Sequence, residues 1–233
     1  MMKYTTISDS HVHSCFSHDG NDPVMMLCDY AMKMGLYALT ITDHCECNMY
    51  EERNYAKAIK DSFVETKRAA AALNGKLHLY KGIELGQATQ NLQAAESILA
   101  ECDFDFVLGS LHNIRGLEDF YLLDYNKLDI HDLLCTYFDE IMELIAWGKF
   151  DSLTHLTYPL RYIVGEQHKE ISYEVYKDRV DDILKALIDQ NKALELNASG
   201  LRQAIGKTMP CPTVIKRFKE LGGKYLTIGS DAH

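Results

Sequence analysis

Short runs with the composition of buried strands alternate with longer helical patterns along the whole chain. This alternation limits what the chain can fold into. Roughly seven such β/α repeats follow one another, with no Pro- or Ser-rich linker between them. Elements in this order build a parallel sheet, either open or closed into a barrel. With 233 residues, of which 47% are hydrophobic, the chain can bury a substantial core. We therefore expect one α/β domain over residues 1–233.

Strands are expected where short runs are apolar and β-branched, as in LYALTIT. The predicted strands are 4–10, 36–42, 77–85, 104–111, 151–156, 193–196 and 225–228. Helices are predicted at about 23–34, 51–73, 90–101, 134–145, 176–188 and 213–221. Asp22 is expected to cap the first helix and Gly35 to end it, and Asn74 and Gly75 are expected to end the second.

Polar side chains with metal-binding or acid–base chemistry follow every predicted strand. In chain order these ends read Asp9-Ser-His11-Val-His13, Thr42-Asp43-His44, Gly82-Ile-Glu84, Gly109-Ser-Leu-His112, Thr154-His155, Glu195-Leu-Asn197 and Gly229-Ser-Asp231-Ala-His233. Parallel α/β folds place their sites at the carboxyl ends of the strands. We therefore expect these side chains to converge.

Imidazole and carboxylate together are ligands for zinc, manganese or ferrous iron. His11 and His13 point the same way because residues i and i+2 share one face of a strand, so both rings can reach one ion. Eight or nine ligands exceed the need of a single tetrahedral ion. They suit two or three ions held close together, as in sites that activate water for displacement at phosphorus. The alternative, hydrogen-bonded histidines without a metal, would have to apply to all six histidines at these strand ends.

Charge and composition exclude several classes of partner. Lys and Arg number 24 against 34 Asp and Glu, a net charge of −10 that repels nucleic-acid backbones, so we expect no nucleic-acid partner. No run approaches the roughly 18 apolar residues of a membrane span, and the N-terminus lacks the apolar core of a signal peptide. The seven cysteines form no CxxC pair and are expected to be reduced thiols. We expect a cytoplasmic protein without a membrane partner; the sequence carries no signal for its oligomeric state.

The motifs at the strand ends resemble those of the PHP (polymerase and histidinol phosphatase) superfamily, and within it the histidinol-phosphatase branch. In family order, and over residues 9 to 233, they read DSHVHSCFSHDG, TITDH, KGIELG, DFVLGSLH, LTHLTYPLRY, LELNASGLR and LTIGSDAH. Each is weak alone, but the combination is specific. The resemblance implies a distorted, TIM-like (β/α)7 barrel with parallel strands and outer helices, and about three divalent ions per chain, zinc, manganese or iron.

The resemblance also assigns ligands to these ions. The residues that match the ligands of one ion are His11, His13, Glu84 and Asp231. Glu84 would bridge to a second ion, which would carry His112 and His155.

His44 and His233 match ligands of the third ion, together with one residue that follows the HxH motif. That residue is Asp in some members and His in others. His18 and Asp19 are adjacent here, and the spacing from His13 favours Asp19. Glu84, Asp231 and His233 are also expected to act directly in catalysis.

The remaining site residues are expected to contact the substrate or to orient ligands. Arg161 in TYPLRY and Arg202 in NASGLR match family positions that hold the substrate phosphate, which suits a guanidinium group. Asn197 is expected to position substrate or water. Asp9 is expected to orient a ligand histidine through its second ring nitrogen.

The resemblance implies hydrolysis of a small phosphate monoester, in which a hydroxide shared by two ions attacks phosphorus. The expected reaction converts L-histidinol phosphate to L-histidinol and phosphate in histidine biosynthesis. One alternative is another PHP phosphoesterase, acting on nucleotides, nucleic-acid ends or phosphotyrosine. The other is a metal-binding PHP module without turnover. Family members usually continue past the position of His233 with a loop and a closing helix, so the chain is expected to lack this segment.

Overall fold

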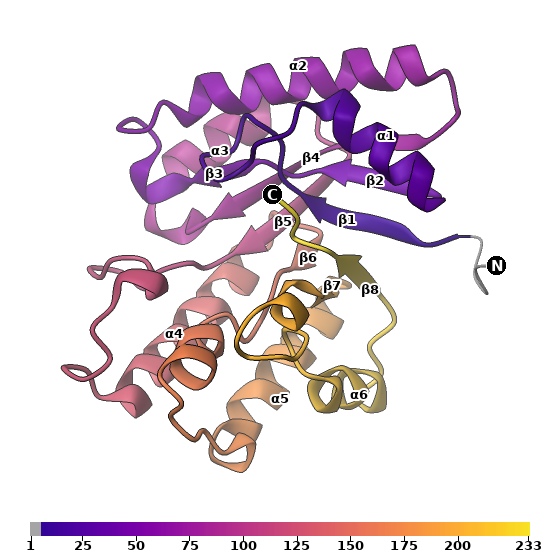
Figure 1. The fold of residues 1–233 in the computed structure, drawn as a ribbon. Coiled ribbons are helices and arrows are strands. Elements are labelled where there is room, and N and C mark those ends of the chain that lie inside the picture. Colours follow the sequence, from indigo (N-terminus) through magenta and orange to yellow (C-terminus); the bar gives the residue numbers. More distant parts are fainter. Residues whose placement is uncertain (1–5) are drawn as a thin grey trace. The chain divides into compact units, whose positions relative to one another are not determined.

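The computed structural model describes residues 6–233, which form two compact units (Figure 1). The first unit runs up to Leu108 and includes Ile228–His233, and the second is Gly109–Thr227. The boundaries fall inside two strands, β5 (Phe106–Ser110) and β8 (Leu226–Gly229). Each of these strands therefore contributes residues to both units.

The first unit is built on parallel strands in the order β1-β2-β4-β5, and β3 pairs with β4. Near the end of the chain, Ala232 pairs in parallel with Val12. The strands are β1 (Ser8–Val12), β2 (Ala38–Ile41), β3 (His44–Glu46) and β4 (His78–Gly86). The helices are α1 (Val24–Met34), α2 (Tyr55–Leu73) and α3 (Leu92–Glu101), with the 3-10 turns η1 (Cys47–Met49) and η2 (Ala88–Gln90).

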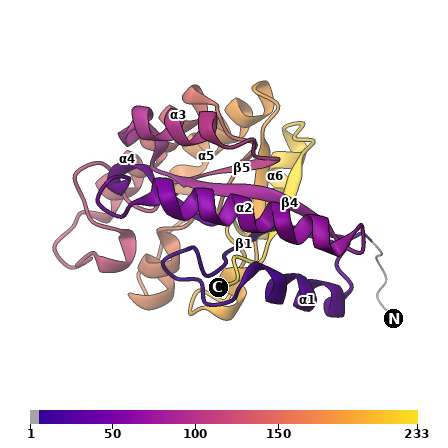
Figure 2. The same cartoon turned by 90° about the horizontal axis from the view of Figure 1, so that it is seen from above.

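The core of the first unit lies between its strands and the helices α1 and α2, which run along one side of the strands (Figures 1 and 2). Val24, Cys28 and Ala31 recur at helical spacing on α1 and are buried against Leu39 and Ile41 of β2. Burying a side chain of the size of Ile41 stabilises the fold by about 1.5–3 kcal/mol. This core holds the ends of β1 and β2 in a fixed position.

The second unit continues the strand order as β5-β6-β7-β8, with β6 and β7 parallel. Helix α4 packs on α5, and α5 packs on α6. The predicted stripe of α4 is buried, from Leu134 to Ile145. The elements are η3 (Phe120–Leu122), α4 (Ile130–Trp147), β6 (Ser152–Leu153), the π-helix η4 (Arg161–Glu166), α5 (Tyr173–Asp189), β7 (Ala193–Asn197), η5 (Ser199–Arg202) and α6 (Pro212–Glu220).

These elements confirm the predicted α/β class with parallel strands and outer helices. Gly35 ends α1 in the left-handed conformation, with φ of 73°. The expectation that Asp22 caps α1 is wrong, because Pro23 takes the cap position and the Asp22 carbonyl accepts a hydrogen bond from the Cys15 amide. Residues 4 and 5 of the first predicted strand lie outside the described residues. Among the residues that are described, no helix is long and apolar enough to cross a membrane.

Candidate functional site

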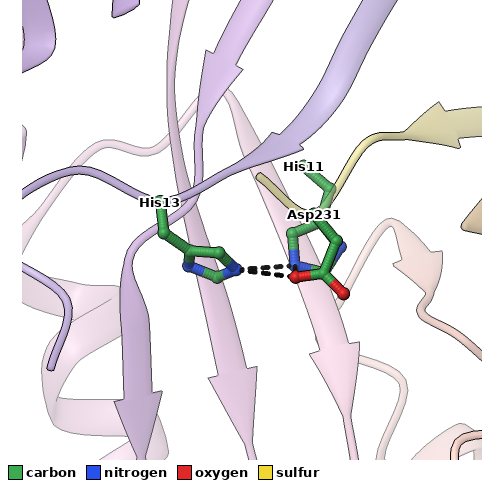
Figure 3. Close-up of side chains that lie close together, drawn as sticks. All are labelled: His11, His13 and Asp231. Carbon is green, nitrogen blue, oxygen red and sulfur yellow. Dashed lines mark hydrogen bonds and ion pairs between the residues drawn. The ribbon is translucent and has the colours of Figure 1, made fainter. Parts of the chain in front are cut away.

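Two histidines and one aspartate meet at the end of β1 (Figure 3). The Nε2 atoms of His11 and His13 lie 3.1 Å apart, and Oδ1 of Asp231 lies 3.3 Å from Nε2 of His13. Both rings are fully buried. The alternation of β1 brings the two rings to one face, as predicted, and the pairing of Ala232 with Val12 brings Asp231 beside them.

The backbone of Asp231 adopts a strained conformation where its side chain meets the two histidines. Its φ is +52°, a left-handed conformation that few residues other than glycine adopt. The amide of Asp231 donates a hydrogen bond of 2.8 Å to the carbonyl of His11, which helps to hold the residue there. Such a conformation costs about 1–3 kcal/mol and is found most often at functional sites.

One oxygen of Glu84 lies close to three imidazole rings. Its Oε2 is 3.4 Å from Nε2 of His11, 3.7 Å from Nε2 of His13 and 2.9 Å from Nδ1 of His44. The register of β3 and β4 places His44 directly opposite Glu84. Carboxylate oxygens among imidazoles are suited to holding metal ions, and the expected bridging role of Glu84 stays a prediction.

Asp19 joins the same group of side chains from the loop that follows β1. Its Oδ2 lies 3.4 Å from Nε2 of His44 and 4.0 Å from Nδ1 of His233. The exposed His18 tilts its ring toward His44, with ring centroids 4.9 Å apart. Both side chains thus lie near His44, and the choice of Asp19, which rests on the spacing, stays a prediction. We call the following residues the first-unit cluster: His11, His13, Asp19, His44, Glu84, Asp231 and His233.

The pKa values within the first-unit cluster shift in opposite directions. Burial, with the nearby charge of His44, lowers the pKa of His13. Burial would also lower the pKa of His44, but the Glu84 charge and hydrogen bonds to Asp19 and Glu46 outweigh it and raise that pKa. Burial would raise the pKa of Asp19, but the contact with His44 holds it well below its usual value. The cluster thus combines a ring that favours its neutral form, His13, with a carboxylate that favours its ionised form, Asp19.

The donor atoms of the first-unit cluster fit divalent ions. Three groups each offer one atom per residue within 4.8 Å of one another: His11 with His13 and Asp231, His13 with His44 and Glu84, and His18 with Asp19 and His44. Oδ1 of Asp19 is buried and accepts no hydrogen bond from the described residues. Imidazole nitrogens and carboxylate oxygens at this density are the ligand set of zinc, manganese and iron.

His112 and His155 form a pair of their own within the second unit, which we call the second-unit pair. Their Nε2 atoms lie 3.3 Å apart, and both rings are buried. The backbone of His155 is fixed from β7, because its amide donates a 2.8 Å hydrogen bond to Glu195. The ring of Tyr158 borders both histidines, at centroid distances of 5.1 and 4.9 Å.

Arg161 begins the π-helix η4 and stacks on two tyrosines of the second unit. Its guanidinium carbon lies 5.8 Å from the ring centre of Tyr158 and 5.3 Å from that of Tyr162. The two tyrosine hydroxyls are 3.0 Å apart. Burial raises the pKa of Tyr158 well above its ordinary value and that of Tyr162 to about 12, so both remain neutral hydrogen-bond donors.

Asn197 shapes the loop that carries Arg202. Its amide donates a 3.1 Å hydrogen bond to Glu195, and its oxygen accepts hydrogen bonds from the amide and hydroxyl of Ser199, at 2.9 and 2.6 Å. Arg202, at the end of η5, is exposed. The contacts within the second unit thus give Asn197 a structural role, and its predicted contact with substrate or water remains a prediction.

Asp9 contacts the backbone on both sides of the site. Its Oδ1 accepts hydrogen bonds from the backbone amides of His11 and Ser230, at 3.3 and 2.9 Å, and its expected role in orienting a ligand histidine stays a prediction. Asp9 therefore ties β1 to the segment that carries Asp231.

Sequence reasoning missed three residues beside the first-unit cluster. Glu46 lies 2.9 Å from Nδ1 of His44, and its HxE spacing could have identified it, since residues i and i+2 share a strand face. The buried Ser17 and Asp43 contact the cluster through hydrogen bonds. Asp43 precedes His44 in the sequence, whereas no local pattern marks Ser17.

Comparison with known proteins identifies the class of this protein. A model of the PHP domain family matches residues 9–199, and the chain therefore belongs to the PHP family.

Within that family, its relatives are histidinol-phosphatases. The "Probable histidinol-phosphatase" of Clostridium acetobutylicum is 30% identical over 230 residues, covering 97% of this chain and 86% of that protein. The histidinol-phosphatase of Lactococcus lactis is 26% identical over 230 residues, covering 97% and 83%.

A solved structure shows the same fold. The crystal structure of histidinol phosphate phosphatase from Lactococcus lactis, complexed with zinc, L-histidinol and phosphate, matches with a TM-score of 0.81 at 24% identity. The match covers 98% of this chain and 86% of that one. It confirms the predicted TIM-like fold class.

Proposed function

We propose that this chain is a metal-dependent phosphatase that hydrolyses L-histidinol phosphate to L-histidinol and phosphate, a step of histidine biosynthesis. Relatives that bear the name of this activity match 97% of this chain. The family match covers residues of both units, which supports one PHP domain over residues 1–233. The thiol form of the seven cysteines supports a cytoplasmic location.

The observation that carries this proposal is the meeting of imidazole and carboxylate atoms in the first-unit cluster. His11, His13, Glu84 and Asp231 would hold one divalent ion. Asp19, His44 and His233 would hold another. The second-unit pair, His112 and His155, is proposed to ligate a further ion. We propose about three ions per chain, zinc, manganese or iron, which when bound activate water and neutralise charge at phosphorus.

The arginines and tyrosines of the second unit are proposed to bind the phosphate group. A guanidinium group binds a phosphate through two parallel hydrogen bonds. The stacking of Arg161 on Tyr158 and Tyr162 restricts its side chain before substrate binds. Arg202 adds a second positive charge, and Asn197 orders the loop that presents it.

The carboxylates of the first-unit cluster have a different task. Glu84, Asp231 and the ring of His233 are proposed to act at the reacting centre. Glu84 and Asp231 lie against the histidine rings beside them and hold these rings in place. Buried His11 and His13 keep water other than the reacting one away from this centre.

The test is phosphate release by the purified chain, with Zn²⁺ or Mn²⁺ added, from L-histidinol phosphate and from a panel containing a nucleotide, a 3′-phosphorylated oligonucleotide and phosphotyrosine. We expect kcat/KM for L-histidinol phosphate to exceed every other value by at least about tenfold, which is about 1.4 kcal/mol of transition-state binding. A chelator should abolish this activity. Preference for another ester would identify a different PHP phosphoesterase, and binding of metal without turnover would identify a metal-binding module.

A further inference from the structure

Asp43 is a buried carboxylate that lies beside the first-unit cluster without belonging to it. Its side chain accepts four hydrogen bonds. Oδ1 accepts a hydrogen bond from the amide of Ser14 at 2.5 Å and another from the hydroxyl of Ser17 at 3.0 Å. Oδ2 accepts a hydrogen bond from the hydroxyl of Ser14 at 2.7 Å and another from the hydroxyl of Ser62. A carboxylate surrounded by donors acts as an acceptor only, which fixes the direction of each hydrogen bond.

Ser17 connects this carboxylate to a metal-ligand candidate. Its hydroxyl has a single proton, and it donates that proton to Asp43. The same oxygen accepts a 2.9 Å hydrogen bond from the backbone amide of His44. It also lies 3.3 Å from Nδ1 of His13. With its proton committed to Asp43, the Ser17 oxygen can only accept from that ring nitrogen.

This direction favours one of the two nitrogens of His13 as the site of its proton. A neutral imidazole has one N–H group; at Nδ1 it donates to Ser17, and Oδ1 of Asp231 is the competing acceptor at Nε2. With the proton at Nδ1, the lone pair is at Nε2. That atom faces Nε2 of His11 at 3.1 Å and Oδ1 of Asp231 at 3.3 Å, at the point where an ion would be held.

We propose that Asp43 and Ser17 are positioning residues that fix His13 in the tautomer presenting Nε2 to a metal ion. They act as a carboxylate–hydroxyl–imidazole chain, the role that sequence reasoning gave to Asp9. The inference rests on the proposed function only in taking His13 as a metal ligand. The tautomer itself is a property of the metal-free protein.

The first test is the tautomer of His13 in the metal-free chain, read from its ring ¹⁵N shifts by NMR. Its signals are identified by their loss in His13→Gln. We expect a protonated Nδ1 and an unprotonated Nε2. Ser17→Ala should abolish this preference. A proton on Nε2 in the unchanged protein, or an unaltered tautomer in Ser17→Ala, would overturn the proposal.

Ser62→Ala is the matched control, because it removes an equally buried hydroxyl from the same carboxylate without touching His13. Both variants lose one hydrogen bond to Asp43, but Ser17→Ala also loses the acceptor of the His44 amide and should unfold at a somewhat lower denaturant concentration. We expect Ser17→Ala to bind Zn²⁺ about 10–100-fold more weakly in competition with a chelator, as when an outer partner of a ligand is lost. Ser62→Ala should bind Zn²⁺ almost as the unchanged chain does. An equal loss in both variants would mean that Ser17 only supports the fold.

The two tests separate this inference from the proposed function. A chain with the expected tautomer and the expected Zn²⁺ affinities that hydrolyses no phosphate ester would refute the function alone. A chain that hydrolyses L-histidinol phosphate with the proton of His13 on Nε2 would refute the positioning role alone.

Discussion

The two units differ in the side chains that surround their histidines. In the first unit, imidazole rings alternate with carboxylates, as where Glu84 lies against His11, His13 and His44. In the second unit, the contacts of His112 and His155 include the ring of Tyr158, on which a guanidinium group also stacks. The first arrangement attracts cations, whereas the second combines a proposed metal-ligand pair with donors for an anion.

The difference explains how an acidic chain can act on a phosphate ester. A net charge of −10 opposes binding of an anion by the protein surface as a whole. Local chemistry must therefore reverse the sign. We interpret the first-unit cluster as the place where bound cations do so, and Arg161 and Arg202 as the protein's own contribution. The predictions below test this division.

The largest effect is expected from Glu84→Gln, which keeps the shape of the side chain and removes its charge. Loss of the carboxylate shared by three histidines should lower kcat/KM for L-histidinol phosphate on the order of 10³-fold. Steady-state kinetics at saturating Zn²⁺ measure it. Glu143→Gln, at a half-exposed carboxylate of the second unit that pairs with Arg115, is the control and should change little. A drop of less than about tenfold in Glu84→Gln would remove Glu84 from the reacting centre.

The next largest effect is expected from metal removal, which should make the folded chain less stable. Ions that bind only the folded chain stabilise it by about 2.7–4.1 kcal/mol at 100 to 1,000 times Kd. Chelation should lower the free energy of unfolding by this amount, as measured by urea denaturation. Hydrogen exchange should quicken more at the end of β1 and in β3 than in α4 and α5. Identical unfolding curves with and without chelator would contradict metal binding to the folded state.

Arg161→Ala should have a smaller effect of a different kind. Loss of a charge-assisted hydrogen bond, about 1.5–3 kcal/mol, should lower kcat/KM about 10–100-fold. Zn²⁺ affinity should not change, since the residue belongs to the anion-binding side of the comparison. Arg179→Ala, at an arginine paired with the exposed Asp139, is the control. If Arg161→Ala weakened Zn²⁺ binding as strongly as it weakened turnover, the proposed division between the units would be wrong.

The smallest effect is expected from Asp19→Asn in the metal-free chain, where the loss of stability should depend on pH. The pKa of Asp19 in the folded state lies below its ordinary value of 3.8. Its stabilisation is therefore present above that value and is lost as the pH falls through the folded pKa. At neutral pH the variant should be less stable by on the order of 1 kcal/mol, after allowance for solvent screening. Urea denaturation should show the difference shrinking as the pH falls below 3.8, and a constant difference would contradict the ion pair.

The fold could be predicted well because its signals are local. Helix α1 ends at Gly35, and α2 ends before Asn74, as their sequences indicate. Strand β3 was not predicted, because its three residues are too few to show an alternating pattern and only two residues separate it from β2. Its existence depends on pairing with β4, a contact that no local pattern encodes.

The candidate site could be predicted as a set of residue types at strand ends, since a strand end is visible in the sequence. The hydrogen bonds around Asp43 could not be predicted from the sequence. Its hydroxyl partners lie 29, 26 and 19 positions away, at Ser14, Ser17 and Ser62. Serine is common in loops and helices, so such spacings carry no signature. Only the folded chain shows which hydroxyls reach a carboxylate.

The contact between His13 and Asp231 joins residues 218 positions apart, and this has a consequence for biosynthesis. At about 5–20 residues per second, a ribosome needs about 10–45 s to pass from the first residue to the second. Throughout that interval the nascent chain displays a histidine pair without its aspartate. The proposed site for an ion at His11, His13 and Asp231 is therefore complete only after Asp231 has been translated.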